Sequence, residues 1–276
     1  MRLIPLLLLA AAAPFAGSAA EAPAIRFIGP VAQGALVRGV APAGTISITL
    51  DDRPVAFAAD GRFILGLDRD APRLARLLVR LADGREVDQA VAVAPRRWPI
   101  EHVGMARRPG GASLTWLRMR EGELARIAAA RALDPPSEGW RQAFAWPARG
   151  RISGRFGAQR VYRGEPAAYH SGVDVAAGAG APVFAPADGV VVLAGPPAFS
   201  LEGNLVIVAH GMGLSSAFLH LSRVDVRPGQ RVVRGQAIGA VGRTGRATGP
   251  HLHWGMKWQA ARIDPQALAG PMPPPS

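Results

Sequence analysis

Residues 24–95 contain short runs in which apolar and polar residues alternate. A period of two is typical of strands with one buried face. The runs cover residues 35–39, 45–50, 62–65, 77–81 and 87–93. Turn-forming sequences such as Asp60-Gly61 and Asp83-Gly84 separate them. Strands at this spacing predict a small β-sandwich of the immunoglobulin-like type. We expect this unit to act as a spacer or binding module, because it holds no catalytic cluster.

A second series of strand-like runs occupies residues 147–266. The runs cover residues 189–193, 205–209, 215–219, 231–233 and 237–239. Glycines lie densely between them, as tight turns in an antiparallel sheet require. The chain is therefore predicted to be mainly all-β. A proline-rich segment, residues 267–276, is expected to form a flexible tail.

Residues 96–146 connect the two series and are predicted to hold one helix. Ser113 or Thr115 is a suitable N-cap, and Pro135-Pro136 ends the pattern. Gly122 weakens the prediction because glycine is a poor helix former. The apolar positions are Leu117, Leu124, Ile127, Ala128 and Leu133. We expect this apolar face to pack on a neighbouring domain.

The first 20 residues are typical of a cleaved signal peptide. Arg2 precedes an apolar run, and Ser18 and Ala20 are the small residues of a cut before Glu21. The alternative is an uncleaved anchor, although the apolar run is short for a bilayer span. The chain has no cysteine, which excludes disulfides, a thiol nucleophile and a cysteine-linked lipid anchor. We therefore expect a periplasmic or otherwise exported protein with no stable membrane insertion after cleavage.

The formal net charge is +12, and Lys257 is the only lysine. A basic surface attracts polyanions, which outside the cytoplasm include acidic cell-wall polymers, anionic peptides and lipid headgroups. Nucleic acid is disfavoured because the arginines are scattered and aromatic residues make up only 6%.

Histidine and aspartate form a candidate metal site. His251 and His253 are two residues apart, so on a strand their side chains face one side. Asp174 alternates with Val173 and Val175, so its carboxylate can face the same site from a second strand, close to His170. Two imidazoles and one carboxylate suit catalytic zinc and leave a fourth position for water. Such water attacks a peptide carbonyl, while neighbouring imidazoles move the proton and stabilise the oxyanion.

The second unit resembles the lysostaphin-type (LytM-type) zinc metallopeptidases, which cut peptide cross-links of bacterial cell walls. The matching motifs cover residues 150–157, 170–177, 181–183, 185–191, 203–204, 210–211, 218–221 and 226–253. The resemblance implies that His170, Asp174 and His253 bind one zinc ion. It also implies that His251 is the general base and that His220 stabilises the transition state.

Two residues depart from the pattern of this family. Phe218 stands where a tyrosine is common, so a phenol hydroxyl is missing, and Gly255 stands where a glutamate is common. We expect His210 to be buried and structural, and His102 to be exposed. The loop at residues 244–249 either borders a substrate groove or is a plain hairpin turn.

The leading hypothesis is an exported zinc endopeptidase that acts on peptidoglycan stem peptides. In a Gram-negative source, the resemblance implies cleavage of the D-Ala to diaminopimelate cross-link. The alternatives are a non-catalytic murein-binding adaptor or amidase activator, and a peptidase acting on proteins or small peptides. Residues 24–95 contain no histidine and are expected to supply no zinc ligand.

Overall fold

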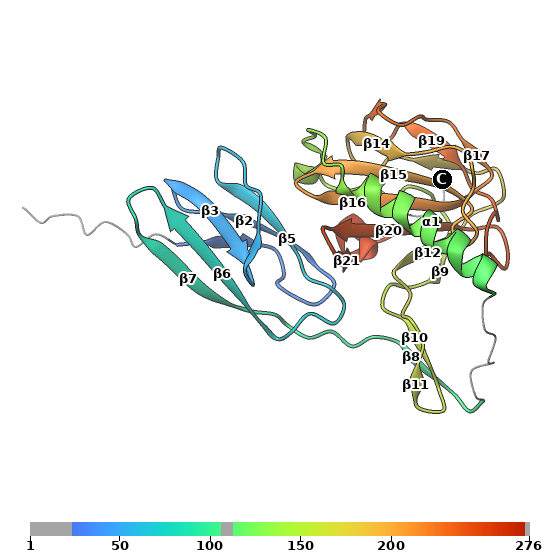
Figure 1. Ribbon diagram of the computed structural model, residues 1–276, viewed down its shortest axis with the longest axis horizontal. Helices are drawn as coiled ribbons and strands as arrows, with labels where there is room; N and C mark the ends of the chain where they lie inside the picture. The colour runs from blue at the N-terminus through green and yellow to red at the C-terminus, as the bar shows by residue number, and fades with distance from the viewer. Residues whose placement is uncertain (1–23, 106–112, 274–276) are drawn as a thin grey trace, which may run out of the picture.

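The computed structural model describes residues 24–105 and 113–273, and it shows a mainly β-stranded protein, as predicted (Figure 1). The predicted signal peptide lies outside the described residues. Within the described residues, no helix is long and apolar enough to span a membrane.

Residues 24–95 form two antiparallel sheets (Figure 1). The three-stranded sheet contains β1 (Arg26–Ile28), β2 (Leu36–Val40) and β5 (Arg62–Gly66); the four-stranded sheet contains β4 (Arg53–Pro54), β3 (Thr45–Leu50), β6 (Leu74–Leu81) and β7 (Glu86–Ala92). Along β6, Leu77 and Val79 are fully buried while Arg76 and Arg80 are exposed, as the alternation predicts. The immunoglobulin-like topology and the domain boundaries remain predictions.

An eight-stranded antiparallel sheet forms the centre of the second unit. Seven strands follow the order β18 (Arg231–Val232), β14 (Gly189–Leu193), β15 (Asn204–Gly211), β16 (Leu214–Leu221), β20 (Leu252–Trp258), β12 (Gly172–Ala176) and β9 (Arg151–Gly154), and β21 (Ala261–Ile263) pairs with β20. A smaller sheet contains β13 (Pro182–Phe184), β19 (Ala237–Ala240) and β17 (Arg223–Val224).

The two faces of the large sheet have different surroundings. One face carries Phe218 and Trp254 into a buried cluster that continues into the N-terminal sheets. Gly66 of β5 lies against Trp258 of β20, where an added Cβ would be 2.6 Å from the Trp258 Cβ. The opposite face carries Ile207 of β15 into a smaller cluster. Helix α1 (Leu114–Ala132) covers part of this second face (Figure 1).

Helix α1 begins as predicted but packs differently. The Ser113 side chain accepts from Trp116 N–H and caps the helix, which continues through Gly122. The expected apolar packing face is confirmed only in part, because Leu117 and Leu124 are 48% and 50% exposed. Only Ile127 and Ala130 join the buried cluster. The helix is held mainly by hydrogen-bonded charged side chains, described with the site below.

The connector also contributes β-structure that the sequence analysis missed. Strand β8 (Ile100–Val103) pairs in parallel with β10 (Gln159–Tyr162), which also pairs with β11 (Glu165–Pro166). These strands form a ribbon that extends from the large sheet (Figure 1). A short 3-10 helix, η1 (Gly139–Arg141), follows α1.

The start of the expected flexible tail is packed against the domain instead. Helix α2 (Pro265–Ala269) occupies them, with Asp264 accepting from Gln266 N–H as its N-cap. The indole Nε1 of Trp146 donates to the carbonyls of Gly270 and Pro271. These hydrogen bonds hold the chain against the domain beyond the end of α2.

Candidate metal centre and groove

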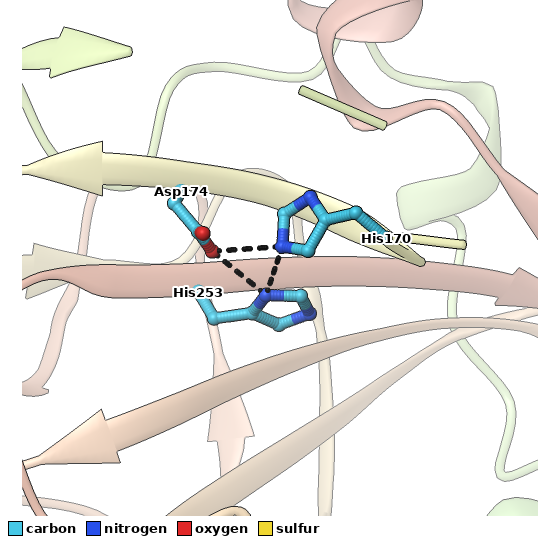
Figure 2. Close-up of side chains that lie close together, drawn as sticks. All are labelled: His170, Asp174 and His253. Carbon is cyan, nitrogen blue, oxygen red and sulfur yellow. Dashed lines mark hydrogen bonds and ion pairs between the residues drawn. The ribbon is translucent and has the colours of Figure 1, made fainter. Parts of the chain in front are cut away.

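Three predicted metal ligands converge on the face of the sheet that also carries α1. Asp174 of β12 lies opposite His253 of β20 in the antiparallel register, and His170 approaches from the segment before β12. The Oδ1 atom of Asp174 is 2.9 Å from His253 Nδ1 and 3.1 Å from His170 Nε2. The two ring nitrogens are 3.1 Å apart. Figure 2 shows the three groups pointing toward one another.

This donor set fits a zinc ion. Because zinc–ligand distances are about 2.0–2.2 Å, atoms around a tetrahedral ion lie roughly 3–3.5 Å apart, close to the observed separations. His170 Nδ1 donates to the Arg155 carbonyl at 3.1 Å, which leaves the Nε2 lone pair directed at Asp174 and His253. Two imidazoles and one carboxylate are unlike the all-oxygen sites of calcium and magnesium.

The protonation of this cluster follows from burial and mutual contact. Burial would raise the pKa of Asp174, but hydrogen bonds from His170 and His253 outweigh it and hold that pKa far below its usual range. Burial lowers the pKa of His253. Burial would also lower the pKa of His170, yet the hydrogen bond with Asp174 raises it overall. The carboxylate is therefore ionised and available to a cation.

Two further histidines lie beside the cluster, and both rings are hydrogen-bonded through Nδ1 to a main-chain carbonyl. His251 Nδ1 donates to the Gly249 carbonyl at 2.9 Å, and His220 Nδ1 donates to the Thr244 carbonyl at 2.8 Å. Their ring centroids are 4.8 Å apart. His251 Nε2 is 3.8 Å from Asp174 Oδ1. Each ring is thus anchored through Nδ1 to a main-chain carbonyl, which leaves Nε2 for chemistry.

His220 reaches the groove through an irregularity in β16. Simple alternation would place it on the same face as Phe218, in the core. However, Phe218 pairs with Val206 while Leu221 pairs with Asn204, so β16 carries one extra residue. His220 has φ +64°, a conformation that costs a non-glycine residue about 1 kcal/mol or more. This β-bulge turns the imidazole onto the face of the metal cluster.

The loop at residues 244–249 borders the groove. Of the two interpretations given from the sequence, a groove border and a plain hairpin turn, the first is the one observed. Arg246, Ala247 and Thr248 line the groove beside the histidines. Thr244 Oγ1 donates to the Leu221 carbonyl and accepts from the Asn204 N–H, both at 2.9 Å. These bonds tie the loop to β15 and β16. Sequence reasoning missed the anchoring carbonyls of Thr244 and Gly249, since main-chain groups leave no signal in residue identity.

The groove continues in both directions from the histidines. Its central part has a volume of about 400 Å³ and is lined by all five predicted site residues. A wider cavity of about 1010 Å³ shares His170, Asp174 and Arg246 with it and is walled by the β8–β10 ribbon. A smaller cavity of about 130 Å³ shares Glu202 and His253 with it and extends under α1. The connector therefore walls the groove at both ends.

The segment that carries α1 is fixed beside this groove by ionic contacts. Arg120 of α1 donates to both carboxylate oxygens of Glu202, at 2.6 and 2.7 Å. Glu123, which is buried, accepts from the N–H and the hydroxyl of Ser200 at 2.6 and 2.7 Å and from Arg120 at 2.9 Å. Bidentate contacts between arginine and carboxylate are among the stronger polar interactions in proteins.

The remaining predicted positions have distinct surroundings. Phe218 is fully buried on the opposite face, so it does not line the groove. Gly255 lies on the groove face beside the His253 ring. His210 is buried and hydrogen-bonded to Asp188 O and Ser216 Oγ, as expected, and burial lowers its pKa to about 4. His102 is exposed, also as expected.

Comparison with known proteins gives consistent matches. Residues 168–265 match the family model described as peptidase family M23. Peptidoglycan DD-endopeptidase ShyA of Vibrio cholerae is 44% identical over 105 residues, which are 38% of this chain and 24% of ShyA. DD-carboxypeptidase/endopeptidase Mpg of Neisseria meningitidis is 39% identical over 127 residues, 45% of this chain and 28% of Mpg. The chain thus spans about a quarter of the length of these curated relatives.

Similarity to a solved structure extends over more of the chain. An M23 peptidase structure from Pseudomonas aeruginosa has 31% sequence identity and a TM-score of 0.66. The match covers 87% of this chain and 95% of that one. The shared architecture therefore includes most of the described residues and is not confined to the groove.

Proposed function

Because the chain belongs to peptidase family M23, we propose that it is an exported zinc metalloendopeptidase that hydrolyses peptide cross-links of bacterial peptidoglycan. The observation that carries this proposal is the convergence of five side chains on one groove. His170, Asp174 and His253 lie within mutual contact, and two imidazoles present Nε2 atoms beside them. The names of the relatives, which describe peptidoglycan endopeptidases, support the substrate class.

In this proposal, His170, Asp174 and His253 hold one zinc ion. The ion, when bound, polarises the scissile carbonyl and acidifies a water molecule. The ionised Asp174 neutralises part of its charge, and the Arg155 carbonyl fixes the ring orientation of His170. Such outer contacts commonly contribute 10–100-fold to metal affinity or activity, by order of magnitude.

His251 is the proposed general base. Its Nδ1–H is held by the Gly249 carbonyl, so a neutral ring carries its lone pair on Nε2, on the side of Asp174. This nitrogen can accept the proton of the attacking water and return it to the leaving amine. The main-chain anchor fixes the tautomer that this transfer requires.

His220 is the proposed stabiliser of the transition state. Because its Nδ1–H is held by the Thr244 carbonyl, Nε2 donates a hydrogen bond only when the ring is protonated. Burial lowers the pKa of His220 and favours its neutral ring, so the donating, protonated ring requires the negative charge of a developing oxyanion beside it. His220 and His251 therefore act in opposite protonation states.

The proposal is tested by metal analysis and by digestion of purified peptidoglycan. We expect one zinc per chain and release of cross-link cleavage products by the wild-type protein. His251→Ala should retain zinc and lose cleavage by at least about 100-fold. His102→Ala changes an exposed histidine of β8 that does not line the groove; it is the matched control and should behave as wild type.

Two results would contradict this function. Failure of the wild-type protein to bind zinc would remove the metal mechanism, and unchanged cleavage by His251→Ala would remove the proposed base. Binding of peptidoglycan without any cleavage product would favour a non-catalytic adaptor. Cleavage of unstructured peptides but not of cross-linked muropeptides would instead indicate a general peptidase.

A further inference from the structure

A small cavity lies on the groove face of the sheet, beyond His253 and beneath α1. Its volume is about 130 Å³, whereas one water molecule needs roughly 10–15 Å³ of such space. Ser171, Glu202, Leu219 and His253 line both this cavity and the central groove. A group attached to a peptide in the groove can therefore enter it.

Three cationic side chains line the cavity. Arg131 comes from α1, Lys257 from β20 and Arg262 from β21. Lys257 is paired in the sheet with Arg262 on one side and with Ser215 of β16 on the other. The three charges thus come from three elements and meet at one end of the groove.

These cations have neutral partners within the described part of the chain. Arg131 donates to the Ser215 hydroxyl at 2.9 Å, and Arg262 donates to the Tyr169 hydroxyl at 3.3 Å. The Lys257 ammonium makes no hydrogen bond to a described residue. Burial, followed by the charge of Arg262, lowers the pKa of Arg131 to about 10. Burial also lowers the pKa of Lys257, with Arg131 and Arg262 adding to the effect.

Nearby carboxylates do not neutralise this end of the groove. Both oxygens of Glu202 are bound by Arg120, which also contacts Glu123, so one cation is shared by two carboxylates and offsets one of their two charges. Asp68 accepts from the Tyr169 hydroxyl and from the main-chain N–H of Arg262. Asp68 thus offsets part of the charge near Arg262, and the cavity retains an excess of positive charge.

The ring of His253 also borders this cavity. Its Nδ1 faces Asp174, and its Nε2 lies on the side of Gly255. Nε2 would be 3.5 Å from a Cβ added at Gly255. Because Gly255 has no side chain, the space beside Nε2 stays open. Apolar side chains, including Ile127, Ile207 and Ala217, form much of the remaining wall.

We propose that this cavity is a subsite for a carboxylate of the substrate peptide, located next to the scissile bond. Arg131, Lys257 and Arg262 supply both the positive charge and the hydrogen-bond donors. A planar carboxylate matches the arginine fork and the size of the cavity. This inference rests on the proposed peptidase function, because the carboxylate belongs to the peptide that the enzyme would cleave. The subsite makes the enzyme selective for peptides that carry a free acid at this position.

The test compares cross-linked peptides that differ in one group. One peptide carries free carboxylates near the scissile bond, a second has its C-terminal carboxylate amidated, and a third has its side-chain carboxylate amidated. Charge-assisted hydrogen bonds are worth about 1.5–3 kcal/mol, which corresponds to roughly 10–100-fold. We expect wild-type kcat/KM to fall by about that factor for one of the two amides, which identifies the source of the carboxylate.

Variants of the cavity locate the effect. Lys257→Met and Arg131→Gln should each reduce the acid-over-amide preference in kcat/KM to a few-fold. Gly255→Glu places a protein carboxylate in the cavity and should abolish the preference as well. Arg227→Gln changes an exposed arginine away from the cavity and should keep the wild-type preference. Thermal melting checks that each variant is folded.

Equilibrium binding separates this proposal from the proposed catalysis. Calorimetry of the three peptides with His251→Ala measures the preference without hydrolysis and should show the same selectivity for the free acid. Equal wild-type binding and cleavage of all three peptides would overturn the subsite. A preference retained in Lys257→Met, Arg131→Gln and Gly255→Glu together would also overturn it. If binding is selective but no peptide is cleaved, the peptidase function fails and the subsite stands.

Discussion

A single methyl group at Gly154 should weaken metal binding. Gly154 lies in β9 opposite Asp174, and a Cβ added there would be 2.4 Å from Asp174 Oδ2. An ordinary contact between carbon and oxygen is about 3.3–3.6 Å, so Gly154→Ala must displace that oxygen by roughly 1 Å. Metal–carboxylate distances are held near 2.0–2.2 Å, and a shift of this size disturbs the ligand geometry.

The expected loss follows from this displacement. Disturbing the groups that orient metal ligands typically lowers affinity by about 10–100-fold, or roughly 1.4–2.8 kcal/mol. The metal-free protein should melt within about 3 °C of wild type, because the Asp174 side chain can rotate away when it is not binding an ion. Competition with a chromophoric zinc chelator measures the affinity, and thermal melting without metal measures the fold.

Gly178→Ala is the matched control. Gly178 is exposed, follows β12 closely in sequence, and an added Cβ there meets nothing within 4 Å. It should keep wild-type affinity. Equal zinc affinity in Gly154→Ala and wild type would refute the role of Asp174 as a ligand held against β9. An equal loss in both variants would show that the effect does not come from the contact with Asp174.

Three further predictions concern the surroundings of the site. The folded-state pKa of His210, about 4, lies below its unfolded value near 6.5. The stabilisation from neutral His210 should therefore be fully present above pH 6.5, and the free energy of unfolding should fall by about 3 kcal/mol in total as pH drops through 4. In urea unfolding measured at several pH values, the free energy of unfolding of His210→Asn should depend less steeply on pH than that of wild type. Glu123→Ala should speed hydrogen exchange in α1, whereas the exposed Glu121→Ala should not. Thr244→Ala should lower kcat by about 10-fold, because the loop that anchors His220 loses two hydrogen bonds; unchanged kcat would contradict this coupling.

The strands and the faces of the candidate metal-binding residues could be predicted because their signals are local. The prediction of residues 45–50 and 189–193 matches β3 and β14. Alternation placed Val173 and Val175 in the core, where both are fully buried, and left Asp174 on the groove face. The hydrophobic period fixes which face each side chain occupies. It does not show that β12 pairs with β20, and the choice of His253 as the ligand beside Asp174 came from the resemblance to a known family.

His220 shows where this reasoning stops. Its neighbours alternate regularly, so the period alone assigns it to the buried face with Phe218. Only the extra residue in β16, with φ +64° at His220, redirects the ring. A bulge depends on how two strands pair, and the residue pattern of β15 or β16 alone does not determine their pairing. The resemblance to a known family supplied the role of His220, whereas the periodicity did not.

Helix α1 shows a different error, in which the spacing of apolar residues was misleading. Its apolar residues predicted a buried stripe, yet the helix contacts the sheet through Arg120 and Glu123 as well as Ile127. Arg120 holds Glu202, whose carbonyl accepts from the His220 N–H at 2.8 Å. The same glutamate lines the groove. One residue thus connects the helix anchor, the main chain of the bulge and the wall of the groove. Removing the contact between Arg120 and Glu202 should therefore displace the main chain at His220 through Glu202, although no histidine is substituted.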